Sequence, residues 1–334
     1  MSMSPRFLRD STDQLSDVLR LVEVHSVISG GFGVAGAWST RFELSSPLKF
    51  IAVVAGRATL TADGVRGPID IETGDVVVLN RRSWATLRGG PAEPVRQLTL
   101  TEPNTFVRID DGDDDVVIGG HIDANRAGVE LLAAGLPPAV HVRASATDAM
   151  HLRETLERIW EEATARRVGA DFAVNQHAQL LVLTVLRAHL AQADELPPGW
   201  LRLLTDDRLR AAVSLMHTDP GRQWRLDELA RAATMSRTAF AERFRDVAGS
   251  PPLAYLSAWR MRLAQRALRD GDVRIGPLAV ELGYTSESAF STAFKRAVGV
   301  SPLNYRASVT PAERFVHENA RSPREIVHRS PRQK

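Results

Sequence analysis

The sequence predicts an α+β, multidomain fold, in which a small all-β barrel or sandwich comes first and an all-α domain with two helix-turn-helix units comes last. Three observations predict this fold. Short apolar or alternating runs follow one another between residues 45 and 120. Helical periodicity replaces them after about residue 147. A stretch with helical periodicity near the end of the chain is then repeated once, with an offset of 50 residues.

Length and composition limit the class of protein. A chain of 334 residues suggests about two domains, and a hydrophobic fraction of 44% suffices for packed cores. The absence of cysteine excludes disulfides and cysteine-ligated zinc. The first residues are polar and mixed in charge, and no apolar run is long enough to cross a bilayer. We therefore expect a cytoplasmic protein.

The strand-rich part is expected to form one domain over residues 1–145. Turn signals such as Asp63-Gly64 separate the apolar runs. Four runs predict strands, at residues 50–55, 58–61, 75–79 and 95–100. Several short strands at close spacing indicate a small all-β barrel or sandwich.

Two helices are predicted next, over residues 150–166 and 171–191. The second is rich in leucine, so the pair is either part of the subunit's own core or a dimer interface. We favour dimerisation and assign residues 146–193 to a helical dimerisation segment. Pro197, Pro198 and Gly199 break the helix, which predicts a linker and interdomain hinge over residues 194–200.

Charge is distributed unevenly along the chain. The net charge is +2, but residues 201–334 carry 23 basic and 14 acidic side chains, whereas residues 1–200 carry 19 basic and 26 acidic ones. Positive charge is thus gathered in the part with the repeated unit, which indicates a polyanionic partner. We expect a helical domain over residues 201–309 and a disordered basic tail over residues 310–334.

Each copy of the repeat is expected to be a helix-turn-helix. The recurring residues are Ser236, Phe240, Phe244, Gly249, Pro252, Leu253 and Tyr255 in the first copy and Ser286, Phe290, Phe294, Gly299, Pro302, Leu303 and Tyr305 in the second. A short helix precedes each copy, over residues 226–233 and 276–282. Phenylalanines four apart lie on one helix face, so they bury against the preceding helix and leave the opposite face free to enter a DNA groove.

A long helix is expected to join the two units. It opens at Pro251 and Pro252 and continues through Leu268. At about 1.5 Å per residue it spans roughly 25 Å, which can hold the two reading helices about one DNA turn apart.

The repeat is specific enough to identify a family. Its first half contains Trp224-Arg225-Leu226-Asp227-Glu228-Leu229-Ala230 and Met235-Ser236-Arg237-Thr238-Ala239-Phe240. Its second half contains Leu282-Gly283-Tyr284-Thr285-Ser286-Glu287-Ser288-Ala289-Phe290 and Gly299-Val300-Ser301-Pro302. These runs resemble the DNA-binding domain of the AraC family.

The preceding part resembles the cupin-like sensor domain of one AraC-family branch. The resemblance is carried by Gly56-Arg57-Ala58, Gly74-Asp75-Val76-Val77-Val78-Leu79, Leu136-Pro137-Pro138 and Pro198-Gly199-Trp200. It implies a β-barrel able to hold a small molecule, followed by helices that pair two subunits.

The chain departs from the metal-binding cupins, which share a His-x-His motif, a downstream Glu and a later His. The comparable strand here is residues 50–54, and the later position is Trp84. Metal chemistry needs about three protein ligands and an open position. We therefore expect no metal, no cofactor and no enzymatic activity, and we interpret His121 and His141 as structural.

The resemblance and the helix geometry together assign residues to DNA. Base contacts are expected from Thr238, Ala241, Glu242, Arg245, Glu287, Ser288 and Thr292. Phosphate contacts are expected from Ser236, Arg237, Arg243, Ser286, Ser291, Lys295 and Arg296. Ser236 and Ser286 are also expected to cap their helices. Candidate lining for an effector pocket is Trp38, Phe42, Phe50 and Trp84.

The leading interpretation is a homodimeric transcription regulator that binds double-stranded promoter DNA in a sequence-specific way and responds to a small-molecule effector, with RNA polymerase as a further partner. The alternatives are a cupin-type enzyme with a helical dimer module and a protein-interaction adaptor. The effector, the operator sequence and the choice between activator and repressor stay open.

Overall fold

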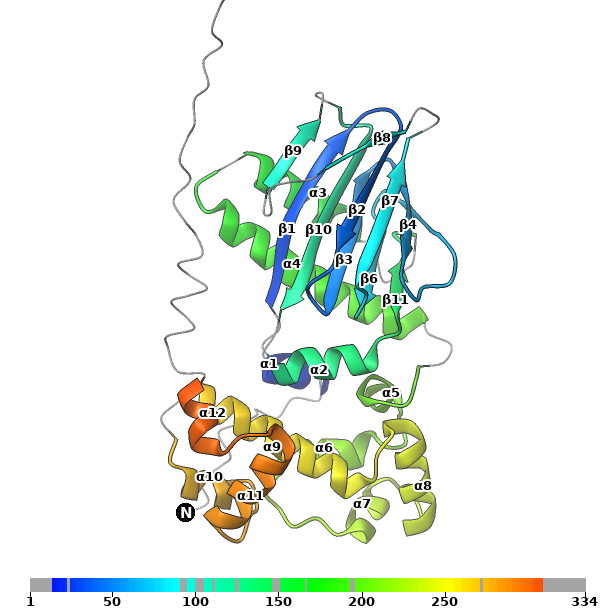
Figure 1. Ribbon diagram of the computed structural model, residues 1–334. Helices are drawn as coiled ribbons and strands as arrows, with labels where there is room; N and C mark the ends of the chain where they lie inside the picture. Colours follow the sequence, from blue (N-terminus) through cyan, green and yellow to red (C-terminus); the bar gives the residue numbers. More distant parts are fainter. Residues whose placement is uncertain are drawn as a thin grey trace, which may run out of the picture. The chain divides into compact units, whose positions relative to one another are not determined.

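The computed structural model describes residues 14–22, 25–90, 95–99, 105–109, 112–123, 126–145, 151–165, 167–192, 196–270 and 273–308 (Figure 1). The tail expected to be disordered and part of the predicted linker lie outside these residues. The chain forms two compact units. The larger unit comprises Asp10–Ser214 and Leu226–Pro252, and the smaller one contains Leu215–Arg225 and the chain from Leu253 onward.

The described strands of the larger unit form two sheets. The six-stranded sheet has the order β11-β6-β3-β10-β1-β9, with β1 His25–Val34, β3 Leu48–Ala55, β6 Val76–Asn80, β9 Thr105–Ile109, β10 Asp115–Asp123 and β11 Ala139–Val142. The five-stranded sheet has the order β5-β4-β7-β2-β8, with β2 Trp38–Glu43, β4 Arg57–Ala62, β5 Ile69–Glu72, β7 Trp84–Gly89 and β8 Arg96–Gln97. Pairing is antiparallel except between β1 and β9 and between β2 and β8.

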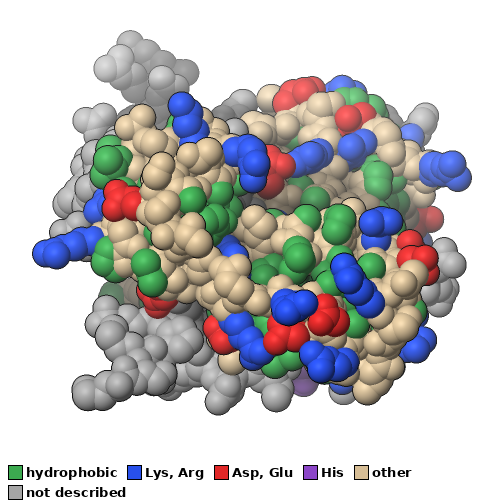
Figure 2. All heavy atoms as spheres, turned by 90° about the horizontal axis from the view of Figure 1, so that it is seen from below, with side chains coloured by type: hydrophobic (Ala, Val, Ile, Leu, Met, Phe, Trp, Pro, Cys, Tyr) green, Lys and Arg blue, Asp and Glu red, His purple; other side chains and the backbone are tan. Residues whose placement is uncertain are grey.

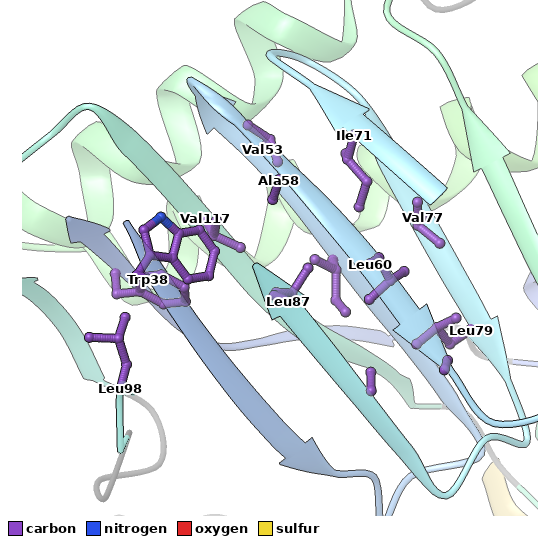
Figure 3. Close-up of a cluster of buried hydrophobic side chains, with 14 of the residues drawn as sticks. Trp38, Val53, Ala58, Leu60, Ile71, Val77, Leu79, Leu87, Leu98 and Val117 are labelled. Atoms are coloured by element: carbon purple, nitrogen blue, oxygen red, sulfur yellow. The ribbon is translucent and has the colours of Figure 1, made fainter. Parts of the chain in front are cut away.

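The main core of the larger unit lies between these sheets (Figure 3). Val53 and Val77 contribute from the six-stranded sheet, and Leu60 and Leu87 contribute from the five-stranded one. Trp38 is fully buried among them, and its indole N–H donates a 2.8 Å hydrogen bond to the Asp115 carboxylate. The alternation of side chains along each strand therefore directs one row into the core and the next row outward.

Two helices pack on the other face of the six-stranded sheet. Helix α3 (Leu152–Ala165) contacts β3, and helix α4 (Ala170–Gln192) contacts β1 and β11. The leucine-rich stripe of α4 is divided between two environments. Leu181 and Leu186 are buried, so they belong to the subunit's own core, whereas Leu180 is 56% exposed.

A further set of helices completes the larger unit. It comprises α1 (Gln14–Val22), α2 (Arg126–Gly135), α5 (Trp200–Thr205), the first half of α6 (Arg210–Thr218), α7 (Leu226–Ala232) and α8 (Arg237–Ala248). Residues 196–199, which the sequence assigned to a linker, approach α8. Leu196 is buried, and the Gly199 N–H donates a 2.9 Å hydrogen bond to the Val247 carbonyl.

The smaller unit is helical throughout its described residues. It contains the end of α6 together with α9 (Pro252–Asp270), α10 (Ile275–Glu281), α11 (Glu287–Val298) and α12 (Pro302–Ser308). Buried aromatic side chains hold it together, with Trp259 stacked on His217 at 3.8 Å and Phe290 beside Phe294 at 5.7 Å between ring centroids.

Most of the predicted elements are present. The predicted strands at residues 50–55, 58–61 and 75–79 coincide with β3, β4 and β6. The two short helices expected at residues 226–233 and 276–282 begin and end within one residue of α7 and α10. Strands β1, β2 and β11 lie outside the region that was predicted to be strand-rich.

Candidate functional site

Helix α8 is capped at both ends and buries one of its faces. Ser236 caps its N-terminus, where the hydroxyl accepts a 3.2 Å hydrogen bond from the Ala239 N–H. Gly249 ends it in the left-handed conformation, with φ of 70°. Phe240 and Phe244 are fully buried, and Val247 is nearly so. The inward face of α8 is thus as predicted.

The outward face of α8 carries the side chains that were expected to read bases. Thr238, Glu242 and Arg245 are exposed, and Ala241 is half-buried between them. Threonine offers a methyl or hydroxyl group, glutamate can accept a hydrogen bond from cytosine N4, and arginine can grip guanine or phosphate. These three side chains lie within two helical turns, so they can contact neighbouring base pairs.

Arg243 differs from the rest of the predicted phosphate set on α8. Its guanidinium forms a 2.7 Å ion pair with Asp206, whose side chain is 7% exposed. The same carboxylate accepts a 3.0 Å hydrogen bond from the Leu209 N–H. Arg243 therefore holds α8 to the segment between α5 and α6, a contact that no local sequence signal reveals.

Helix α11 repeats this construction. Ser286 accepts a 3.1 Å hydrogen bond from the Ala289 N–H, and Gly299 ends the helix with φ of 91°. Phe290 and Phe294 are fully buried, while Val298 is only half-buried. The predicted DNA-contacting residues are exposed apart from half-buried Ser291, and they are Ser286, Glu287, Ser288, Ser291, Thr292, Lys295 and Arg296.

Figure 2 shows Lys and Arg side chains interspersed with acidic and hydrophobic ones on the face that it views. The exposed Arg237 at the start of α8, and Lys295 and Arg296 near the end of α11, are among the basic residues of these units. Basic side chains on this surface favour a polyanionic partner, such as a DNA duplex.

The larger unit also contains a cavity of about 770 Å³, lined by strands of both sheets. The apolar lining includes Phe32, Phe42, Leu44, Phe50, Ile51, Leu87, Leu98, Val107, Ile109, Val117 and Ile118. Polar or charged lining residues include Ser29, Glu43, Lys49, Arg96 and Gln97. A volume of this size suits a small organic molecule.

Two of the four aromatic residues predicted for an effector pocket line this cavity, namely Phe42 and Phe50. Trp38 lies in the core between the sheets, where its ring meets Phe32 edge to face. The guanidinium of Arg41 lies 4.3 Å above the Trp84 ring. Sequence reasoning missed Lys49 and Ser29, although Lys49 is one of only three lysines in a chain with 42 basic residues.

Within the described part of the chain, no group of three or more His, Cys, Asp or Glu side chains is arranged to hold a metal ion. None of the described helices is long and apolar enough to cross a membrane.

Comparison with known proteins agrees with this arrangement. A cupin family model matches residues 13–191, and a helix-turn-helix domain model matches residues 229–308. An AraC-like transcription regulator of Streptomyces lividans is 37% identical over 89% of this chain and 99% of its own length. A second one, from Streptomyces antibioticus, is 36% identical over 90% of this chain and its full length.

Among solved structures, the DNA-binding domain of AdpA in complex with a target DNA is 35% identical, with a TM-score of 0.31 over 33% of this chain and 98% of that one. The family models and the full-length relatives cover both halves of the protein. The chain therefore belongs to the AraC-like transcription regulators, DNA-binding proteins that here combine an N-terminal cupin domain with a C-terminal helix-turn-helix domain.

Proposed function

We propose that this regulator reads DNA bases mainly through α8, anchors itself on phosphates through α11, and changes its DNA binding when a small molecule occupies the cupin cavity. The observation that carries the proposal is the division of α8 into two faces. Phe240 and Phe244 are fully buried, whereas Thr238, Glu242 and Arg245 are exposed.

The two reading helices offer different chemistry. Glutamate and arginine on α8 can each recognise one base by hydrogen bonding. Serine and threonine hydroxyls on α11 discriminate bases less well, while Lys295 and Arg296 can pair with phosphates. Direct discrimination is therefore assigned to Thr238, Ala241, Glu242 and Arg245, with a smaller part for Glu287, Ser288 and Thr292.

Helix α9 is the proposed spacer between the reading helices. It has 19 residues and is therefore about 28 Å long. This length is close to the roughly 34 Å between successive major-groove faces on one side of a duplex. We propose that one subunit contacts two adjacent major-groove segments.

The larger unit offers a route from the cavity to the first reading helix. Strand β10 lines the cavity and leads within three residues into α2. The Trp200 indole of α5 donates a 2.7 Å hydrogen bond to the Leu131 carbonyl of α2. Arg202 of α5 in turn donates to the Asp246 carbonyl of α8 at 3.3 Å. A ligand that binds one arrangement of these helices better than another would shift the population of DNA-binding states.

The protein is proposed to act as a homodimer through α4. Phe172 and Leu180 are eight residues apart, so they lie on the same side of the helix, and they are 71% and 56% exposed. Val168, just before α4, is fully exposed. Apolar side chains gathered on one exposed helix face favour a protein contact.

The proposal is tested by selecting duplexes from a random pool with the full chain and measuring affinities for the selected and scrambled duplexes by fluorescence anisotropy. Glu242→Ala is expected to relax the preference at one base pair, by about 1 to 3 kcal/mol, with little change on scrambled DNA. Lys295→Ala is expected to lower the affinity for both duplexes alike. It should also reduce the slope of log affinity against log salt concentration by about one counterion.

Glu157→Ala serves as the control, because this exposed glutamate lies on α3 and outside the proposed interface. Equal losses on both duplexes for Glu242→Ala would contradict base reading by α8. A chain that binds selected and scrambled duplexes equally would contradict the proposal as a whole.

A further inference from the structure

The cavity wall carries a basic group centred on Lys49. The Lys49 ammonium donates a 3.5 Å hydrogen bond to the Ser29 hydroxyl, and that hydroxyl lies 3.0 Å from Nδ1 of His121. Lys49 and Ser29 line the cavity directly. The three residues come from three adjacent strands, β3, β1 and β10, in which Lys49 and His121 are paired across the sheet.

The strand geometry explains why these groups face inward. Ile51 and Val53 on β3 belong to the core between the sheets, so Lys49 lies on the same face by the two-residue period. Val117 on β10 belongs to that core too, which places His121 on the inner face. Ser29 is the extra residue where the β1–β10 register shifts, and such a bulge redirects a side chain.

Lys49 is electrically uncompensated in this position. Burial lowers the pKa of its ammonium, and no carboxylate of the described residues contributes to that shift. The Lys49 ammonium donates its hydrogen bond to a neutral hydroxyl, that of Ser29. Glu43 also lines the cavity, but its carboxylate is paired with Arg41 at 3.4 Å. A half-buried cation of this kind is stabilised when an anion reaches it.

Gly119 provides the room beside this group. It lies between Val117 and His121 on the inner face of β10, and a Cβ built there would have only the Phe50 carbonyl, at 3.7 Å, within 4 Å. The space that a side chain would fill is therefore open to a ligand. A larger residue at position 119 would enter the cavity, and its Cβ would make only an ordinary van der Waals contact with the Phe50 carbonyl.

We propose that the cavity binds an organic acid with an apolar body and a single carboxylate. The carboxylate pairs with Lys49 and accepts from the Ser29 hydroxyl, while the body lies among side chains such as Phe42, Leu87 and Val107. The inference rests on the proposed function in one respect, because the acid would be the effector of the regulator.

Binding to the full chain without DNA tests this inference by itself. Hexanoate, decanoate, hexadecanoate and phenylacetate are compared by titration calorimetry with the alcohols of the same carbon skeleton. At least one acid is expected to bind about tenfold or more tightly than its alcohol, since a charge-assisted hydrogen bond is gained. If no acid exceeds its alcohol, the proposal is overturned.

Three variants locate the site. Lys49→Met is expected to remove the preference for the acid and to keep the binding of the alcohol, while Lys49→Arg keeps the preference. Gly119→Leu is expected to weaken binding of the acid and of the alcohol alike, about tenfold or more, because its side chain takes up cavity space beside Lys49. Arg57→Met, an exposed cation of β4 outside the cavity, is the matched control and leaves both affinities unchanged.

Circular dichroism checks that each variant is folded. If one variant does not fold, the comparison of acid with alcohol on the unsubstituted chain still tests the proposal. An acid preference that survives in folded Lys49→Met overturns the proposal. Anisotropy on the selected duplex then separates the two claims. Acid binding without DNA binding contradicts the proposed function and leaves this inference intact. DNA binding without acid binding contradicts this inference and leaves the proposed DNA-binding function intact.

Discussion

Gly283 occupies a turn that leaves no room for a side chain. Its φ is 79°, in the left-handed region that favours glycine, and a Cβ there would lie 2.1 Å from the Gly221 carbonyl oxygen. Thr234 takes the same place in the turn of the first unit, with φ of 53°. In each turn the next residue donates its N–H to a carbonyl five positions back.

Gly283→Ala is expected to lower the free energy of unfolding of the smaller unit by about 3 kcal/mol, because conformational strain and a backbone clash add together. Gly299→Ala is the matched control, since its φ is also positive but a Cβ there has nothing within 4 Å. It is expected to cost about 1 kcal/mol. Urea unfolding of both variants measures the difference, and equal losses would contradict the role of the Gly221 contact.

The buried His217 is expected to make the stability of the smaller unit sensitive to acid. Burial lowers the pKa of its imidazole to about 3, with a smaller contribution from Arg262. The ring stacks on Trp259, and Nε2 lies 2.8 Å from the Tyr255 hydroxyl. Below about pH 6.5 the unfolded chain binds a proton on this residue that the folded chain does not.

The free energy of unfolding is therefore expected to be fully retained above about pH 6.5 and to fall by about 1.4 kcal/mol per pH unit between there and pH 3. His217→Phe is expected to lose this part of the slope, at a cost of about 1 kcal/mol near neutral pH for the missing hydrogen bond. Urea unfolding at pH 7.5 and pH 5 measures both. Burial lowers the pKa of His189 as well, so only the difference between the two chains reports on His217. An unchanged slope in the variant would contradict this assignment.

The residue scale also shows what local patterns can and cannot reveal. Ser236 and Phe240 were predictable, because capping and four-residue spacing are properties of a single helix. The ion pair of Arg243 joins residues that are 37 positions apart, and the chain between them gives no sign of it. The sequence therefore assigned Arg243 to phosphate alone, because its position on a reading helix was the only visible signal.

At the scale of elements, Asp206 connects the segment between α5 and α6 to α8. It caps the start of α6 through the Leu209 N–H and pairs with Arg243. Asp206→Ala is expected to cost about 3 kcal/mol of unfolding free energy, because it removes a cap and leaves a partly buried guanidinium unpaired. In a double-mutant cycle, Asp206 and Arg243 are expected to show a coupling of about 1 kcal/mol or more.

The neighbouring Asp207 provides the control. It pairs with Arg210, but both side chains are well exposed, so Asp207→Ala is expected to cost less than about 0.5 kcal/mol. Thermal and urea unfolding of the single and double variants measure these values. Additive effects of Asp206→Ala and Arg243→Ala would contradict a direct link between α8 and this segment.

Strand β1 shows why some elements escaped prediction. It contains Gly30, Gly31 and Gly33, and glycine disfavours strands. In the fold, however, β1 lies between β10 and β9, where the chains approach closely. A Cβ at Gly31 would lie 2.8 Å from the Val117 carbonyl oxygen, so glycine is required by a partner nearly 90 residues away. The cavity and its Lys49 also depend on long-range packing, so they could not be predicted from the sequence. The helical repeat could be predicted, because it is a local pattern.

At the scale of the whole molecule, the excess of positive charge and the exposed apolar stripe of α4 belong to different parts of the chain. The excess of nine basic groups after residue 200 favours the duplex, while the acidic first part is repelled by phosphates. The apolar stripe with Phe172 and Leu180 lies on α4, in the acidic part of the chain, where it is available to a second copy. Division of the two surfaces between the two parts of the chain lets DNA binding and self-association be tested separately.

The double variant Phe172→Glu with Leu180→Glu is expected to sediment as a monomer at micromolar concentration, because two carboxylates would be buried without partners at the proposed interface. Its affinity for a duplex with two copies of the selected site is expected to fall roughly a hundredfold, as the gain from bivalent binding is lost, while its affinity for a single copy is unchanged. Arg57→Glu changes the net charge by the same amount on an exposed residue of β4 and is expected to leave both quantities as they are. A double variant that remains dimeric would place the subunit contact elsewhere than α4, and a monomer that still binds the two-copy duplex at full strength would show that pairing of subunits contributes nothing to recognition.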